Sequence, residues 1–179
     1  MPTTCKYVAG RQVFNGNAQV VAAGCISENA RVHTSTAETV LLSETIYANE
    51  LDGTDIHFRI TLAGEISSTG TGDCTLTLRY GTTDILALVT VSLADEDDRQ
   101  WRAVIEGRVH TTGATGKVVA TGRMDINQGS PLLVVNDTAS AGVTVDLTAA
   151  GSLNVTAHWD ASSADNDIIA MIGFIEFYR

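Results

Sequence analysis

From residue 38 onward, apolar and polar residues alternate in short runs that are separated by Gly, Thr, Asp and Ser. In the run 56–66, Phe58, Ile60 and Leu62 fall on one side of an extended chain, while Arg59 falls on the other. A period of two is typical of a β-strand with one buried face. No segment keeps the 3.6-residue period of a helix, and 52 of the 179 residues are Val, Ile or Thr, which favour strands. The pattern predicts an all-β protein.

The alternating runs predict eight main strands, at 38–46, 56–66, 73–80, 84–93, 101–110, 117–126, 152–159 and 168–178. We expect residues 127–147 to form an irregular insertion before the seventh strand. Eight medium strands with short connections fit an eight-stranded, jelly-roll-like antiparallel sandwich. A closed barrel of the lipocalin type is the alternative. The insertion counts against it, as do the bulky inward residues that would fill its ligand cavity.

The first 37 residues differ from the rest in regularity and charge. They contain three cations and one acid, so they carry a net charge of +2 on a chain whose total is −10. We therefore divide the chain into an N-terminal arm, 1–37, with room for a small hairpin, and a β-sandwich domain, 38–179. A slightly basic arm on an acidic body is where we expect a partner to bind. The candidate contact residues are Lys6, Tyr7, Arg11, Phe14 and Arg31.

Charge and the ends of the chain exclude several classes of partner. With 11 Lys and Arg against 21 Asp and Glu, the chain lacks the cations that nucleic acid or an anionic membrane surface would require. The start of the sequence lacks the apolar stretch of a secretory signal. The longest apolar run, 168–175, is too short to span a membrane.

The three cysteines form no recognisable set. Cys5, Cys25 and Cys74 make neither a closed set of disulfides nor a zinc-binding pattern. A pair between Cys5 and Cys25 is conceivable from the sequence, but it would leave one thiol over. We expect a chain made in a reducing cytoplasm, with Cys74 as a buried, inert thiol in its strand.

The residue types that carry out catalysis or bind metals are present but scattered. His33, His57, His110 and His158 stand alone and are expected at the surface. The acidic tract 95–98 is the best cation candidate, but it lacks the glycine and spacing of a calcium loop and is expected to be a solvated connection. No G-x-S-x-G nucleophile motif occurs. The sequence therefore predicts no catalytic residue, no metal site, no cofactor and no enzyme activity.

Aromatic side chains could mark a carbohydrate-binding surface. Trp101 and Trp159 both fall on the inward side of their strands, which predicts packing in the core. Tyr47 and Tyr178 are better placed for contacts outside the core.

Three stretches carry a resemblance to a known group of proteins. The residues 32–46, 58–64 and 75–81, the last reading Thr-Leu-Thr-Leu-Arg-Tyr-Gly, resemble small β-rich virion proteins of tailed bacteriophages. These proteins occur among head decoration (cement) proteins and fibre-like appendages. The resemblance covers about residues 32–178 and leaves 1–31 outside. It implies a jelly-roll fold, trimers, and binding to a capsid or tail lattice.

These observations lead to three hypotheses about function. The first is a non-enzymatic virion structural protein, a capsid decoration protein that binds the major capsid protein or other virion proteins on the capsid exterior as a homotrimer. The last strand is apolar on both faces, so we expect its side chains at the contact between subunits; the alternative is that one chain's own second sheet covers them. The expected contact residues are Ile169, Met171, Ile175 and Phe177. The second hypothesis is a tail fibre or baseplate domain that binds host glycans, and the third is a hydrolase on a sandwich scaffold.

Overall fold

The computed structural model describes residues 20–22, 30–51, 53–90, 93–127 and 133–178. These residues form strands and connections, and the described chain contains no helix. The strands are β1 (Val20–Ala22), β2 (Ala30–His33), β3 (Thr39–Ile46), β4 (His57–Thr69), β5 (Cys74–Tyr80), β6 (Thr83–Val89), β7 (Asp95–Thr111), β8 (Gly116–Ile126), β9 (Leu133–Val145), β10 (Gly151–Trp159) and β11 (Asp167–Tyr178). Among the described residues there is consequently no helix of the length and apolarity that crossing a membrane requires.

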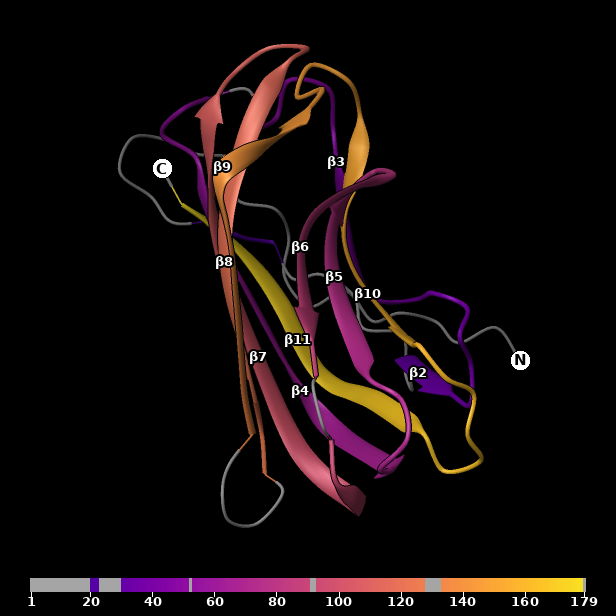
Figure 1. Ribbon diagram of the computed structural model, residues 1–179. Helices are drawn as coiled ribbons and strands as arrows, with labels where there is room; N and C mark the ends of the chain where they lie inside the picture. Colours follow the sequence, from indigo (N-terminus) through magenta and orange to yellow (C-terminus); the bar gives the residue numbers. More distant parts are fainter. Residues whose placement is uncertain (1–19, 23–29, 52, 91–92, 128–132, 179) are drawn as a thin grey trace, which may run out of the picture.

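The strands form two antiparallel sheets that face each other (Figure 1). The large sheet has the order β1-β11-β4-β7-β8-β9, with β2 pairing on β11 as well, and the small sheet has the order β3-β10-β5-β6. The chain crosses repeatedly between the sheets, and the last two strands return beside early ones: β10 lies between β3 and β5, and β11 lies beside β4. Such crossed returns are typical of a jelly roll. The predicted all-β, jelly-roll-like antiparallel sandwich is confirmed.

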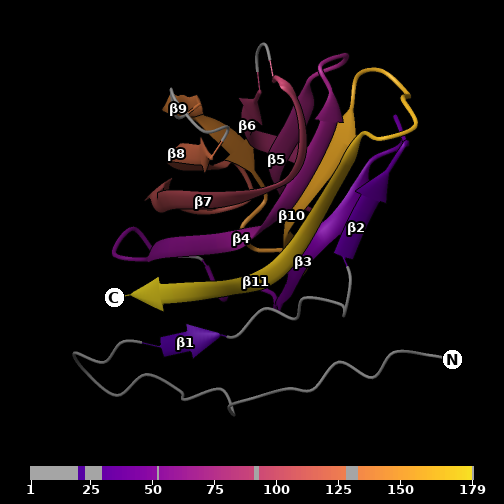
Figure 2. The same ribbon diagram turned by 90° about the horizontal axis from the view of Figure 1, so that it is seen from below.

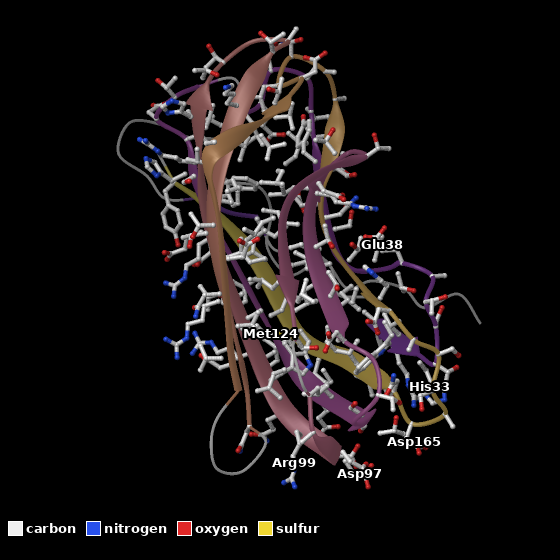
Figure 3. All side chains as sticks on the ribbon, viewed as in Figure 1. His33, Glu38, Asp97, Arg99, Met124 and Asp165 are labelled. Carbon is white, nitrogen blue, oxygen red and sulfur yellow. The ribbon has the colours of Figure 1, made fainter. Side chains whose placement is uncertain are left out.

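The hydrophobic core lies between the two sheets, where inward side chains from both meet (Figure 3). Met124 of the large sheet and Trp159 of the small sheet are both fully buried. Trp101 is buried too, so both tryptophans occupy the inward positions that the alternation predicts. At Gly122 a Cβ atom would lie 2.7 Å from Leu86 Cδ2, so the missing side chain lets the small sheet approach β8 closely.

The segment expected to be an irregular insertion is instead a long strand, β9. It pairs with β8 from Ile126↔Leu133 to Gly116↔Val145, interrupted by one register shift. The expectation was wrong because β9 is the edge of the large sheet. Along most of its length only Val135 and Ala139 pack against the core, while Asn136 and Thr138 are exposed, so the strand lacks a clear apolar period. From β3 to β11 the described chain therefore has nine strands, not eight.

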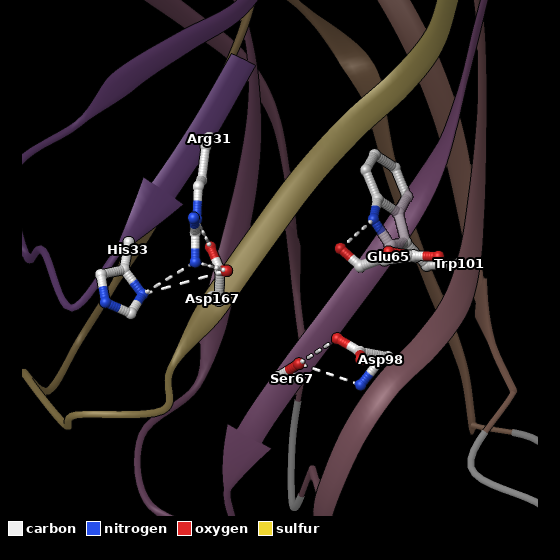
Figure 4. A network of polar contacts seen from close by, with 7 residues as sticks. All are labelled: Arg31, His33, Glu65, Ser67, Asp98, Trp101 and Asp167. Carbon is white, nitrogen blue, oxygen red and sulfur yellow. Dashed lines mark hydrogen bonds and ion pairs between the residues drawn. The ribbon is translucent and has the colours of Figure 1, made fainter. Parts of the chain in front are cut away.

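The acidic tract 95–98 is also part of a strand, where a solvated connection was expected. Asp95 pairs with Thr69 at the end of β4, and the register of the two strands shifts nearby, between Ile66 and Ser68. Asp98 has a positive φ of 48°, and its N–H donates a hydrogen bond of 3.0 Å to Ser67 Oγ (Figure 4). The side chain of Ser67 thus stabilises a bulge that continues β7 through the acidic residues.

The short strands β1 and β2 lie along the outer edge of β11 (Figure 2). β2 pairs from Ala170↔Ala30 to Asp167↔His33, and β1 pairs from Ala22↔Ile175 to Val20↔Phe177. Ala30 and Val32 are buried, so residues 30–33 belong to the large sheet and its core. The division drawn from the sequence had put these residues in the N-terminal arm, 1–37.

A candidate binding groove on the large sheet

Polar side chains gather on the outer face of the large sheet, the face turned away from the small sheet. Along β4, His57 is exposed while Phe58 and Ile60 point inward. Along β7, Glu106, Arg108 and His110 follow one another on the outer side. Nitrogen-tipped side chains project from this face in Figure 3. The two-residue alternation of each strand therefore places charged groups on one continuous surface.

The register of the strands brings particular residues side by side across this surface. His57 of β4 is paired with Arg108 of β7, and Arg108 is paired with Val119 of β8. Two residues earlier along β7 lies the next row of side chains on this outer face. There Glu106 is paired with Thr121 of β8, and Thr121 is paired with Thr138 of β9. Two rows of side chains thus run at right angles to the strands.

These rows line an open groove of about 380 Å³. Its lining residues are His57, Glu106, Gly107, Arg108, His110, Val119, Ala120, Thr121, Thr138 and Ser140. A second hollow of about 300 Å³ shares His57, Glu106 and Gly107 and extends to Tyr178 of β11. Together they cross from β11 to β9, which is four interstrand spacings or about 19 Å.

The sheet beneath the groove is closely packed. A Cβ atom on Gly107 would lie 2.2 Å from Phe58 Cζ, so the Phe58 ring lies directly against the backbone of β7 on the core side. The same ring meets Phe177 in an edge-to-face contact, with centroids 6.5 Å apart and an interplanar angle of 61°. The floor of the groove is therefore closely packed.

The charges of the groove are unevenly compensated. Glu106 is the only carboxylate among the lining residues of the two hollows, and its Oε1 lies 3.6 Å from Arg59 Nε. Among the described residues, the side chains of Arg108, His57 and His110 make no hydrogen bond or ion pair with any group. The groove thus presents hydrogen-bond donors, hydroxyl groups and the half-buried apolar side chain of Val119 to solvent, while the Ala120 side chain is buried in the core.

At the β11 end, Tyr178 supplies an aromatic wall. Its hydroxyl donates a hydrogen bond of 2.8 Å to Glu176 Oε2. Partial burial, followed by the contact with the Glu176 carboxylate, raises the pKa of the Tyr178 hydroxyl above its ordinary value. The phenol is therefore neutral in the groove at physiological pH.

The four histidines occupy different surroundings. His57 and His110 come together in the groove, although the sequence placed them far apart. His33 is exposed on β2, with Nδ1 at 3.9 Å from Asp167 Oδ2, and His158 lies half-buried on the small sheet. The described residues contain no group of three or more His, Cys, Asp or Glu side chains that could hold a metal ion.

The candidate arm residues are only partly within the described chain. Lys6, Tyr7, Arg11 and Phe14 lie outside it. Arg31 lies in β2 and pairs with Asp167 of β11 through two contacts, Nε–Oδ1 at 2.8 Å and Nη2–Oδ2 at 2.5 Å (Figure 4). This pair attaches β2 to β11 within one chain, and binding of Arg31 to a partner stays a prediction.

The candidate subunit-contact residues divide into two groups. Ile175 and Phe177 are buried in the core of their own chain. Ile169 is half-buried, whereas Met171 is exposed at a register shift in β11. Of the aromatic residues expected outside the core, Tyr47 is exposed and Tyr178 lines the groove.

Fold and groove together define a class of protein: an antiparallel β-sandwich that displays an open polar groove on the face of one sheet. No protein-family model matches the sequence, and no curated protein matches it. Among solved structures, the chain is similar to the lectin UEA-II in complex with galactose, with 10% identity over 94% of this chain and 86% of the lectin, at a TM-score of 0.40. It is also similar to the CBM2 module of the evolved Dit protein of Lactobacillus casei BL23 phage J-1, with 9% identity over 94% of this chain and 79% of that module, at a TM-score of 0.38. Both TM-scores are low, so neither likeness carries an argument about function.

Proposed function

We propose that this chain is a non-enzymatic saccharide-binding domain of a bacteriophage virion, of the tail fibre or baseplate kind. The virion part of the proposal rests on the resemblance of residues 32–178 to virion proteins. The binding part rests on one observation: the open groove that crosses the large sheet from Tyr178 to Ser140.

The chemistry of the lining fits a sugar chain. Saccharides offer many hydroxyl groups, which planar donors such as Arg108 and the two histidines, and hydroxyls such as Thr121 and Thr138, can pair with. The rings also have apolar patches, for which the side chain of Val119 and the ring of Tyr178 provide contact area. A length of about 19 Å leaves space for several linked rings.

The composition of the groove favours binding over hydrolysis. Glycoside hydrolases use two carboxyl groups on either side of the scissile bond. In the described chain, Glu106 is the one carboxylate among the lining residues, and its Oε1 lies 3.6 Å from Arg59 Nε. The described lining residues of the two hollows contain no second carboxyl group that could act with Glu106 as a general acid.

A test removes the two histidines that the groove brings together. An oligosaccharide array first identifies a saccharide that binds the wild-type protein. The double variant His57→Ala with His110→Ala should bind this saccharide about tenfold more weakly, because it loses two hydrogen bonds. His33→Ala is the matched control, because this histidine is also exposed but lies on β2. The proposal fails if a broad array gives no saccharide that binds, or if the double variant binds as well as the control in titration calorimetry.

We propose as a second candidate the capsid decoration protein, a homotrimer on the capsid exterior that contacts the major capsid protein. The observation that favours it is the exposed apolar pair Met171 and Ile172, with 54% and 58% of their surfaces accessible, beside a hollow of about 420 Å³ over β4 and β7. Counting copies per particle separates the two candidates. Hundreds of copies would support the head lattice, and a handful would support the tail.

A further inference from the structure

We infer that the saccharide bound in the groove is anionic, and that its carboxylate or sulfate group contacts Arg108. The inference rests on the proposed function and names the class of ligand for the same groove.

Arg108 lies in the middle of the groove, with His57 beside it on β4 and Val119 beside it on β8. His110 follows on the same outer side of β7. A guanidinium binds a carboxylate or sulfate through two parallel N–H···O bonds, and neighbouring imidazoles can donate further hydrogen bonds to the same group. Val119, the neighbour of Arg108 on β8, is apolar and offers contact area for the sugar ring that carries such a group.

This acidic chain pairs most of its described arginines with acids, and Arg108 shares with Arg102 the absence of such a pair. Asp167 pairs with Arg31, Asp125 pairs with Arg123, and Arg79 contacts both Asp84 and Glu38. The chain has 21 Asp and Glu against 11 Lys and Arg, so it contains more than enough carboxylates to pair with every arginine. Within the described chain the Arg108 side chain nevertheless has no hydrogen bond or ion pair.

The one carboxylate in the groove does not neutralise Arg108. Glu106 lies two residues before it on β7, and Glu106 Oε1 is engaged at 3.6 Å by Arg59 Nε. Arg59 Nε is itself buried without a hydrogen-bond partner, and its contact with Glu106 is an ion pair. The part of the groove formed by Arg108, His57 and His110 thus contains a guanidinium without a carboxylate partner among the described residues, on a protein of net charge −10.

The experiment compares acidic saccharides with uncharged derivatives of the same chains. The probes are tetragalacturonate, a hyaluronan tetrasaccharide and a chondroitin sulfate tetrasaccharide. Each acidic probe is compared with a neutral derivative in which its carboxyl groups are methyl-esterified. For the chondroitin sulfate tetrasaccharide, the neutral derivative is also desulfated. We expect at least one acidic probe to bind the wild-type protein about tenfold or more tighter than its neutral derivative, as for one charge-assisted contact. Arg108→Gln should remove this difference.

Arg102→Gln is the matched control, because Arg102 is exposed on the same side of β7 but does not line the groove. This variant should keep the preference for the acidic probe. The inference is overturned if neutral forms bind as well as acidic ones, or if Arg108→Gln and Arg102→Gln behave alike; in both cases saccharide binding itself stands. If no probe and no neutral oligosaccharide binds, the proposed function fails together with the inference.

Discussion

Gly107 illustrates how one missing side chain fixes the floor of the groove. Its Cβ position would fall 2.2 Å from Phe58 Cζ, closer than non-bonded carbon atoms approach. We expect Gly107→Ala to lower the free energy of unfolding by about 1–3 kcal/mol, the range for an overpacked core, as measured by urea denaturation. In a Phe58→Leu background the same substitution should cost much less. Equal costs in both backgrounds would show that the Phe58 ring is not the cause.

Cys74 is a second residue whose behaviour follows from burial. It is a free and completely buried thiol, as the sequence predicts, and desolvation raises its pKa. Because the thiolate is the reactive form, Cys74 should not react with a thiol reagent at pH 8 in the native protein, and should react fully in urea. A variant with Cys5→Ser and Cys25→Ser isolates this thiol for the measurement. Rapid labelling of the native variant would contradict the buried position.

At the scale of elements, the turn between β9 and β10 depends on one carboxylate. Asp146 Oδ1 accepts hydrogen bonds from Thr148 Oγ1 at 2.6 Å, from Thr148 N at 2.9 Å and from Ala149 N at 3.3 Å. These bonds lower the pKa of Asp146 below its ordinary value of 3.8. Tyr80 completes the turn by donating its hydroxyl proton to Ala149 O at 3.0 Å.

The lowered pKa of Asp146 gives the stability a defined dependence on pH. The ionised form favours the folded state fully above pH 3.8, and this contribution disappears as the pH falls through the lower, folded-state pKa. Asp146→Asn should therefore have a lower melting temperature than the wild type at pH 7, and the difference should shrink below pH 3.8. Asp165→Asn, at an exposed loop position labelled in Figure 3, is the control and should match the wild type at both pH values. A gap for Asp146→Asn that persists in acid would contradict the charge-based explanation.

The elements also show where sequence patterns suffice. Strands that face the core on one side, such as β8, follow from alternation, and so do the buried positions of Trp101 and Trp159. The edge strand β9 was not predictable, because contact with the core at few positions leaves no apolar period to detect. The strand character of the acidic tract also could not be predicted, since it depends on the contact between Ser67 and Asp98 across two strands.

At the scale of the whole molecule, the groove depends on which strands are neighbours. The sequence correctly puts His57 and His110 on polar faces, but it does not show that β4 lies beside β7 or that β8 follows it. Those adjacencies are set by the crossed connections between the two sheets, which involve residues far apart in the chain. The groove therefore becomes visible only in the assembled sandwich, although each of its side chains obeys the local alternation.

The central claim, that the outer face of the large sheet binds a saccharide, is tested most directly by mapping amide chemical shifts during a titration with the tightest-binding oligosaccharide. The account predicts shifts concentrated at His57, Arg108, His110, Val119 and Thr121, with little change on the outer face of β3 and β10 in the small sheet. Shifts confined to the small sheet, or spread over the molecule without a centre at Arg108, would contradict it.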